Sequence, residues 1–437
     1  FTSGTEVYVH GYTNDGAIIA NVTGGTILAS TPPKNLALGD QKTLAVLVHF
    51  TDSKKPFITK IKINTFLFSG NIKSFFAETS DKLTSFSGAV TDWVTIPRKV
   101  RRTETNTCDW PGVEEIYPLI KNKYKLENYS RLILFTDSTD CLYGGMGTVG
   151  VSPYYINNKI YNISVAWVAI NPNAMTEKSS DHPFSWQYAD YVTTHELGHN
   201  LGAMHANSLE CSGLAIANDA SCSHREYGNR FDVMGYGSAA LHFNGFFKDI
   251  FGWLQNVDIF GGILGTSKSL ITITKNGSYS LKPLENSTGL RVAKIKFPNK
   301  DEFPYYIEYR RGLKYDANLA SKTHDYSANQ NGIFVYWVPK KSNLFSRLLD
   351  MSPQSSPDEW NDGDIVTLQR GGGVFEDKAR GIRIGPVTKA DGNGASFNVS
   401  FFEPQCMRNA PTIDIQNIKL YPNVEFYNSF SITNNDS

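Results

Sequence analysis

The segment from residue 195 to residue 205 reads HELGHNLGAMH and concentrates side chains that can bind a metal. Three of the chain's nine histidines lie in it, together with one glutamate. His195 and His199 are four positions apart, so an α-helix places both imidazoles on one face. Gly202 tolerates the left-handed conformation that ends a helix. The chain can then return His205 toward the other two histidines.

This spacing predicts a catalytic zinc site. Three neutral imidazoles fill three corners of a zinc tetrahedron and leave the fourth for water. Bound zinc lowers the pKa of that water from about 15.7 towards about 7. Glu196 can take the proton and hand it to a leaving amine. The alternative is a pair of surface histidines on a helix plus a loop histidine, which does not explain why a glycine falls between His199 and His205.

A second motif, DVMGYG at 232–237, follows the third histidine after about thirty residues. HExxHxxGxxH followed by a methionine turn is the signature of the metzincin zinc peptidases. Met234 is then expected to form the hydrophobic floor beneath the metal without binding it. Tyr236 stands two positions after the methionine, as does a metal-reaching tyrosine of astacin-like and serralysin-like enzymes. It is a candidate for oxyanion stabilisation, or alternatively a wall residue of the cleft.

Within the metzincins, the chain resembles the gametolysin family of secreted zinc peptidases. The resemblance rests on THELGHNLGAMHA (194–206), EYGNRFDVMGYG (226–237), LHFNGFFKDIFGWL (241–254), KTLAVLVHFTD (42–52) and CLYGGMGTVG (141–150). It covers residues 40–255 well and the region after them more loosely. It implies an α/β metzincin-type domain with a twisted sheet, two long helices above the cleft, and the methionine turn and a last helix below. The roles given above to the three histidines, Glu196 and Met234 carry over position by position.

Continuous apolar runs at 43–50, 131–137 and 164–170 predict buried strands. Between and after them, the sequence predicts helices over 71–83, 113–126 and about 184–203. The alternation of helices with apolar strands indicates an α/β layer with a largely parallel sheet.

After residue 265 the sequence changes to short alternating segments separated by Gly, Asn, Asp and Pro. Eight such segments predict an all-β, sandwich-like domain. We therefore expect four parts: a β-rich leader or propeptide remnant (1–38) with a hairpin, a catalytic domain (39–262), a β-sandwich domain (263–403) packed tightly against it, and a linker or tail (404–437).

The composition limits the possible partners, and the glycosylation sequons point to an extracellular protein. Lys+Arg and Asp+Glu both number 42, which gives no reason to expect nucleic acid or an anionic membrane as partner. No apolar run approaches the roughly 18 residues that span a bilayer. Seven N-glycosylation sequons favour a secreted glycoprotein; they are Asn21, Asn128, Asn162, Asn276, Asn286, Asn398 and Asn435.

The chain has five cysteines. Cys211 and Cys222 flank a loop between the third histidine and the methionine turn, and we predict that they form a disulfide. Cys108 would then pair with Cys141, leaving Cys406 free or bonded outside the chain. The alternative is that all five are reduced and buried.

Two acidic turns, DSTD (137–140) and NDGD (361–364), could hold Ca²⁺, although such turns are usually only solvated. His224 and His242 lie close to the motif in sequence. His242 is expected to pack beneath the site rather than bind the metal.

These observations favour a secreted zinc endopeptidase, a monomeric catalytic unit that hydrolyses extracellular proteins or glycoprotein matrix. One alternative is a non-catalytic surface adhesion protein on a metzincin scaffold, in which the sandwich does the binding. The intact glutamate of the motif argues against that alternative. A third hypothesis is a latent zymogen. The leader contains no cysteine, which excludes a cysteine switch within it, and an inhibitory segment removed upstream of it stays open.

Overall fold

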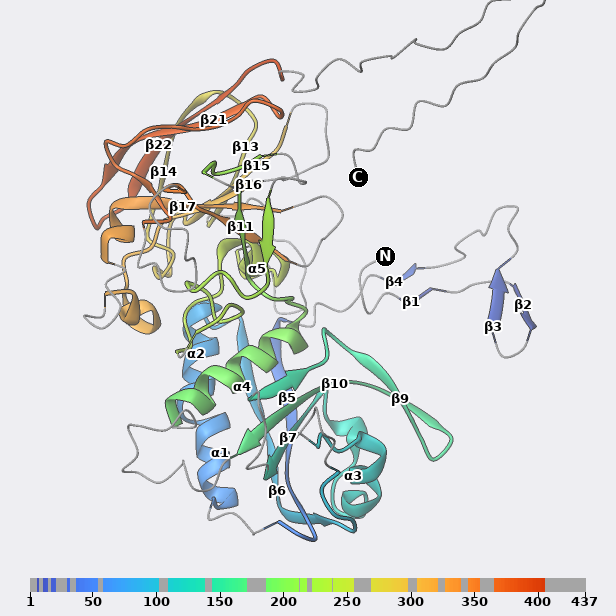
Figure 1. Cartoon of the computed structure of the whole chain (residues 1–437). Helices are drawn as coiled ribbons and strands as arrows, with labels where there is room; N and C mark the ends of the chain where they lie inside the picture. The colour runs from blue at the N-terminus through green and yellow to red at the C-terminus, as the bar shows by residue number, and fades with distance from the viewer. Residues whose placement is uncertain are drawn as a thin grey trace, which may run out of the picture.

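The structure is a computed structural model in which helix α4 lies between a lower sheet and two upper sheets (Figure 1). It describes residues 6–7, 11–14, 17–20, 30–31, 37–53, 58–101, 109–137, 144–170, 186–211, 213–217, 222–237, 239–254, 269–297, 305–320, 327–338, 345–353 and 365–404. Within the leader, β2 (Gly11–Asn14) and β3 (Ala17–Ala20) form the predicted hairpin, and β1 (Glu6–Val7) pairs with β4 (Ser30–Thr31).

The lower sheet has the strand order β6-β5-β7-β10-β8. Its strands are β5 (Gly39–Phe50), β6 (Thr84–Ile96), β7 (Arg131–Asp137), β8 (Gly145–Gly147) and β10 (Lys159–Ile170), and β9 (Ser152–Ile156) pairs with β10. Strands β5, β6, β7 and β10 are parallel, whereas β8 runs antiparallel to β10 at the edge. The three predicted apolar strands are the adjacent β5, β7 and β10. Strands β6, β8 and β9 were not predicted.

Alternate residues of this sheet belong to two different hydrophobic cores, one on each face, because successive side chains of a strand point to opposite faces. In β7, Ile133 and Phe135 pack with α1 (Lys60–Phe68), α2 (Asn71–Thr79) and α4 (Trp186–Leu201). Leu132 and Leu134 pack with α3 (Val113–Ile120) on the other face. Helices therefore cover both faces of the sheet, which is why its central strands are continuous apolar runs.

The helix boundaries differ from the expected ones for local reasons. The helix predicted over 71–83 ends at Thr79, because Asp81 and Lys82 adopt positive φ values of 54° and 67° before β6 begins. The helix predicted over 113–126 ends at Ile120. Helix α1 was missed because its sequence KIKIN alternates polar and apolar residues as a strand does.

The upper part contains an eight-stranded sheet, ordered β12-β11-β18-β17-β16-β15-β13 with β19 beside β17, and a four-stranded sheet, ordered β14-β22-β21-β20. The strands are β11 (Asn207–Glu210), β12 (Ser223–Arg225), β13 (Leu270–Ile273), β14 (Gly277–Leu281), β15 (Val292–Ile295), β16 (Tyr305–Glu308), β17 (Gly332–Trp337), β18 (Arg347–Leu349), β19 (Leu368–Gln369), β20 (Phe375–Asp377), β21 (Ile382–Ala390) and β22 (Ala395–Phe401). Side chains from both sheets, such as Ile307 and Phe397, share one core.

The eight-stranded sheet includes segments from both sides of residue 262. Strands β11 and β12 come from the stretch between His205 and Met234, and β11 pairs in parallel with β18. The chain that leaves the histidine motif therefore runs directly into a sheet completed by much later residues.

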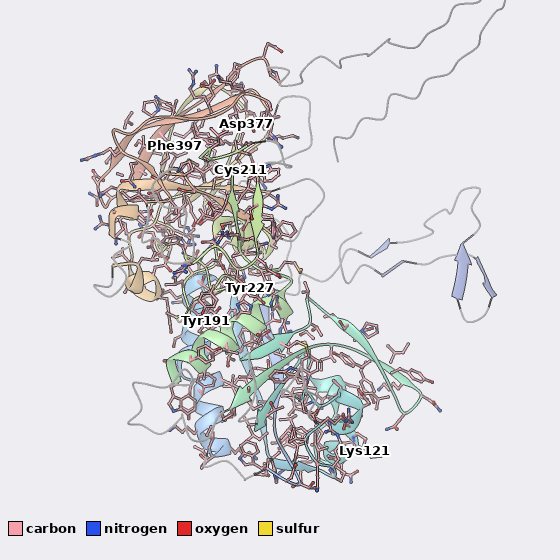
Figure 2. The ribbon with its side chains drawn as sticks, in the orientation of Figure 1. Lys121, Tyr191, Cys211, Tyr227, Asp377 and Phe397 are labelled. Carbon is pink, nitrogen blue, oxygen red and sulfur yellow. A yellow bond between two sulfur atoms is a disulfide. The ribbon has the colours of Figure 1, made fainter. Side chains whose placement is uncertain are left out.

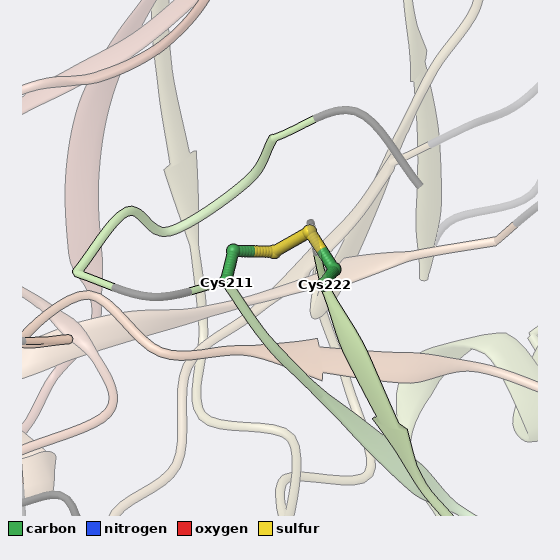
Figure 3. The surroundings of a disulfide bond; sticks show 2 residues. All are labelled: Cys211 and Cys222. Atoms are coloured by element: carbon green, nitrogen blue, oxygen red, sulfur yellow. A yellow bond between two sulfur atoms is a disulfide. The ribbon is translucent and has the colours of Figure 1, made fainter. Parts of the chain in front are cut away.

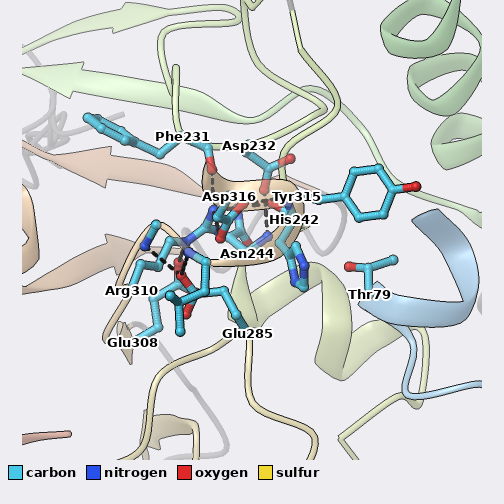
Figure 4. Close-up of polar contacts among 12 residues, drawn as sticks. Thr79, Phe231, Asp232, His242, Asn244, Glu285, Glu308, Arg310, Tyr315 and Asp316 are labelled. Carbon is cyan, nitrogen blue, oxygen red and sulfur yellow. Dashed lines mark hydrogen bonds and ion pairs between the residues drawn. The ribbon is translucent and has the colours of Figure 1, made fainter. Parts of the chain in front are cut away.

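A buried ionic network also connects residues before position 262 with residues after it (Figure 4). Arg310, fully buried, forms ion pairs with Glu308 and Asp316 and donates hydrogen bonds to the carbonyls of Phe231 and His242. Burial alone would lower the pKa of the guanidinium, but the two carboxylates raise it well above its ordinary value. The second oxygen of Glu308 accepts from the N–H of Gly245, the first residue of α5 (Gly245–Ile250), at 2.5 Å.

Replacing Arg310 with methionine should lower the free energy of unfolding by about 3–5 kcal/mol, because two buried carboxylates lose their counter-ion. The matched control is Arg383→Met, which removes a partly exposed pair with Glu376 and should cost roughly 0–1 kcal/mol. Urea unfolding of both variants measures the difference. Equal losses would show that the buried network around Arg310 stabilises the fold no more than a partly exposed ion pair does.

Candidate metal centre

Helix α4 carries the first two histidines and is anchored to the sheet at its C-terminal end. Arg131 of β7 donates to the carbonyl of Asn200 at 2.7 Å, and the Asn200 side-chain amide donates to the Val165 carbonyl of β10 at 2.9 Å. Gly202, with φ of +110°, then ends the helix, as predicted. His195 and His199 are buried on this fixed helix, with exposures of 5% and 6%.

His195, His199 and His205 come together as the sequence predicted. Each offers a ligand atom, and these atoms lie within 4.8 Å of one another. In each ring, Nδ1 faces an acceptor: the Val233 carbonyl for His195 (2.8 Å), the Ala203 carbonyl for His199 (2.8 Å) and Glu226 Oε1 for His205 (2.6 Å). Such partners fix the proton on Nδ1, so the three Nε2 atoms keep their lone pairs.

The donor set therefore fits a divalent metal such as zinc. Burial lowers the pKa of all three histidines, to about 4 for His199 and well below the ordinary value for His195, so the rings are neutral. The Nε2 atoms of His199 and His205 lie 3.2 Å apart. Two nitrogens bound to one tetrahedral zinc would be about 3.4 Å apart. Two unprotonated nitrogens at this distance repel each other, and a cation between them removes the repulsion.

Glu196 lies beside the triad against the edge strand β8. It is 5% exposed, and burial raises the pKa of its carboxyl to about 8. A Cβ at Gly145 would come within 2.7 Å of Glu196 Oε1, so glycine lets the strand pass this close to the carboxylate. The glycine-rich GGMG (144–147), part of the segment CLYGGMGTVG on which the resemblance rests, thus borders the site.

The methionine turn closes the site from the other side of α4. Met234 is fully buried, and a Cβ at Gly198 would lie 2.4 Å from the Met234 sulfur, so the helix and the turn are in close contact. The turn is ordered by Asp232, whose Oδ1 accepts from the Met234 N–H at 2.7 Å. The Met234 carbonyl accepts from Ala206, next to the third histidine, at 2.9 Å.

Three other residues considered in the sequence analysis are not part of the triad. Tyr236 is 60% exposed, and its backbone N–H donates to the Tyr227 carbonyl at 2.8 Å. His242 is buried and its Nε2 lies 2.8 Å from Glu78 Oε1, so it packs rather than joins the triad. His224 packs against the ring of Phe345. Among the residues that the structure describes, the triad is the one group of three or more side chains that could hold a metal.

The predicted disulfide between Cys211 and Cys222 is present (Figure 3). Cys108, Cys141, Cys406, Asn21, Asn435, the NDGD turn and most of the DSTD turn lie outside the described residues. Of the remaining sequons, Asn128, Asn162 and Asn276 are exposed, and Asn286 and Asn398 are half-buried. No helix in the described part of the chain has the length and apolar character needed to cross a bilayer.

Two residues at the site were missed by sequence reasoning. Glu226 contacts the third histidine, and the Tyr227 ring packs on the same imidazole with centroids 3.7 Å apart. Figure 2 labels Tyr227 near helix α4. Both residues lie within the quoted segment EYGNRFDVMGYG, but nothing in a single sequence assigns them to the metal site.

One family model matches the part of the chain that forms this site. A model of metallo-peptidase family M12, of the Reprolysin_5 type, matches residues 117–239, which include all three histidines, Glu196 and Met234. The match supports a metzincin-like metallopeptidase domain. None of the curated proteins matches the chain. One solved structure, titled "Structure of a chaperone-substrate complex", aligns at 15% identity and a TM-score of 0.20, over 52% of this chain and 32% of that chain.

Removing one ligand should abolish tight metal binding. We expect His199→Ala to weaken zinc affinity by more than the ~10–100-fold typical of losing a supporting partner, because a ligand itself is lost. His224→Ala, a nearby histidine outside the triad, should bind zinc as the wild type does. Zinc content after dialysis and isothermal titration of the metal-free proteins compare the two. Tight, one-to-one zinc binding by His199→Ala would rule out the triad as the metal site.

Proposed function

We propose that the chain is a secreted zinc endopeptidase of the gametolysin type that hydrolyses peptide bonds in extracellular proteins or glycoprotein matrix. The observation that carries the proposal is the convergence of three neutral imidazoles, each with a free Nε2, beside the buried carboxyl of Glu196. The M12 family match over the same residues supports it. An adhesion protein has no need of this carboxyl at this place.

The roles follow from where the groups lie. A zinc ion held by the three histidines would act as a Lewis acid and make a water reactive near neutral pH. The charge of that ion would favour the ionised form of the Glu196 carboxyl, which is placed to accept the proton of the water and to give it to the leaving amine. Strand β8 ends the sheet order beside Glu196, so an extended peptide could pair with it and bring its backbone to the site. Tyr236 stays a candidate for oxyanion stabilisation if substrate draws it inward.

The proposal extends to organisation and location. We infer a catalytic domain over 39–262 and a β-sandwich domain over 263–403, with β11 and β12 of the first completing a sheet of the second. The disulfide and the exposed sequons support an extracellular location. We propose a monomeric catalytic unit, with extracellular protein or glycoprotein substrates and no nucleic-acid partner. A calcium ion bound at the acidic turns remains a separate prediction.

Glu196→Gln should keep stoichiometric zinc, because the three imidazoles are untouched, and should lower peptide cleavage by about 10²–10⁴-fold. Glu403→Gln changes an exposed carboxylate and should leave cleavage unchanged. Zinc content and hydrolysis of a mixed peptide library would be measured for both, with and without a chelator. If the wild type holds zinc yet cleaves nothing and Glu196→Gln behaves identically, the adhesion hypothesis replaces the peptidase.

A further inference from the structure

His205 is the one histidine of the triad that α4 does not place. The helix ends at Leu201, Gly202 turns the chain, and the backbone around Ala203 is used to cap the helix and to bind His199. The third imidazole must therefore be positioned by residues outside the HExxHxxGxxH motif.

Two consecutive residues, Glu226 and Tyr227, make these contacts. Glu226 Oε1 accepts from His205 Nδ1 at 2.6 Å and so fixes the edge of the ring. The Tyr227 ring packs on the face of the His205 ring, with centroids 3.7 Å apart and planes inclined by 32°. It also lies nearly parallel to His195, at 5.9 Å and 21°. We call Glu226 and Tyr227 the clamp.

The backbone of the clamp is itself held in place. Tyr227 has φ of +61°, in the left-handed region that a residue with a Cβ rarely adopts. Its N–H donates to Asn207 Oδ1 at 3.0 Å, and its carbonyl accepts from Tyr236 at 2.8 Å. A conformation of this kind persists only where the surroundings over-determine it. Asn207 lies two residues after His205, so its hydrogen bond to Tyr227 connects the backbone near the third ligand with the backbone of the clamp.

The hairpin of β11 and β12 sets the distance between ligand and clamp. His205 lies just before β11, and Glu226 and Tyr227 lie just after β12. The strands pair antiparallel, with Ser208 opposite Arg225, so both groups lie at the open end of the hairpin. Cys211 and Cys222 join the two strands at the other end.

We infer that Tyr227, through its ring, and Glu226, through its carboxylate, are positioning residues that hold His205 ready for the metal. Tyr227, and not Tyr236, is then the tyrosine that supports metal binding. It does so through the contact of its ring with His205 and not through its phenol oxygen. This inference rests on the proposed metal binding. The four groups that carry it — His205, Glu226, Tyr227 and the hairpin — lie together in the described part of the chain.

The test measures the zinc dissociation constant of each metal-free protein by competition with a chromophoric chelator. Tyr227→Leu removes the ring and should weaken zinc binding by about 10–100-fold, as should Glu226→Ala. Tyr227→Phe keeps the ring and should bind zinc as the wild type does. Tyr236→Leu is the matched control and should also leave the Kd unchanged. Urea unfolding of the metal-free proteins should give similar midpoints for Tyr227→Leu and Tyr227→Phe, since a purely structural role would lower both midpoint and affinity.

Several results would overturn the inference. These are an unchanged Kd in Tyr227→Leu, a loss of affinity in Tyr236→Leu equal to that in Tyr227→Leu, or a weakened Kd accompanied by an equal loss of stability without metal. If Tyr227→Phe loses zinc affinity as Tyr227→Leu does, the phenol oxygen and not the ring positions His205, and the ring-based account is wrong. A wild-type protein that binds no zinc would remove the proposed function itself, whereas the other outcomes leave it standing.

Discussion

The site depends on one interaction made three times: the Nδ1–H of a histidine donating to a neighbouring oxygen. His195 and His199 are buried, and His205 is half-buried. These bonds orient the three rings and keep the proton on Nδ1, so that each Nε2 lone pair is available to a metal. Without a cation, the arrangement holds two unprotonated Nε2 atoms 3.2 Å apart in a partly buried place. The folded site therefore favours a positive ion.

The acceptors come from three different parts of the chain. Ala203 belongs to the helix end, Val233 to the methionine turn and Glu226 to the turn after β12. The methionine turn is in turn tied to the upper sheet, because Arg310 donates to the Phe231 carbonyl while it pairs with Glu308 and Asp316. Strand β11, next to the third histidine, pairs with β18 of that sheet. The later β-rich region thus supports the metal centre and is more than an appended module.

Much of this could be read from the sequence, and the rest could not for identifiable reasons. Spacing alone brought the three histidines together, and the loop-flanking positions of Cys211 and Cys222 predicted their disulfide. Strand β6 was missed because it lies at the sheet edge and its apolar residues are interrupted by polar ones. Arginine is usually exposed, so nothing in the sequence indicated that Arg310 is fully buried. The contact of Tyr227 with His205 depends on strand register and a positive φ, which a single sequence does not encode visibly.

The central claim is that three imidazoles and no other protein side chain hold the metal. X-ray absorption at the zinc edge, on protein loaded with one equivalent of zinc, tests it most directly. The account predicts nitrogen neighbours at about 2.0–2.1 Å, with the outer-shell scattering of three imidazole rings and one further light atom. Sulfur neighbours at about 2.3 Å, or scattering from fewer than three rings, would contradict it.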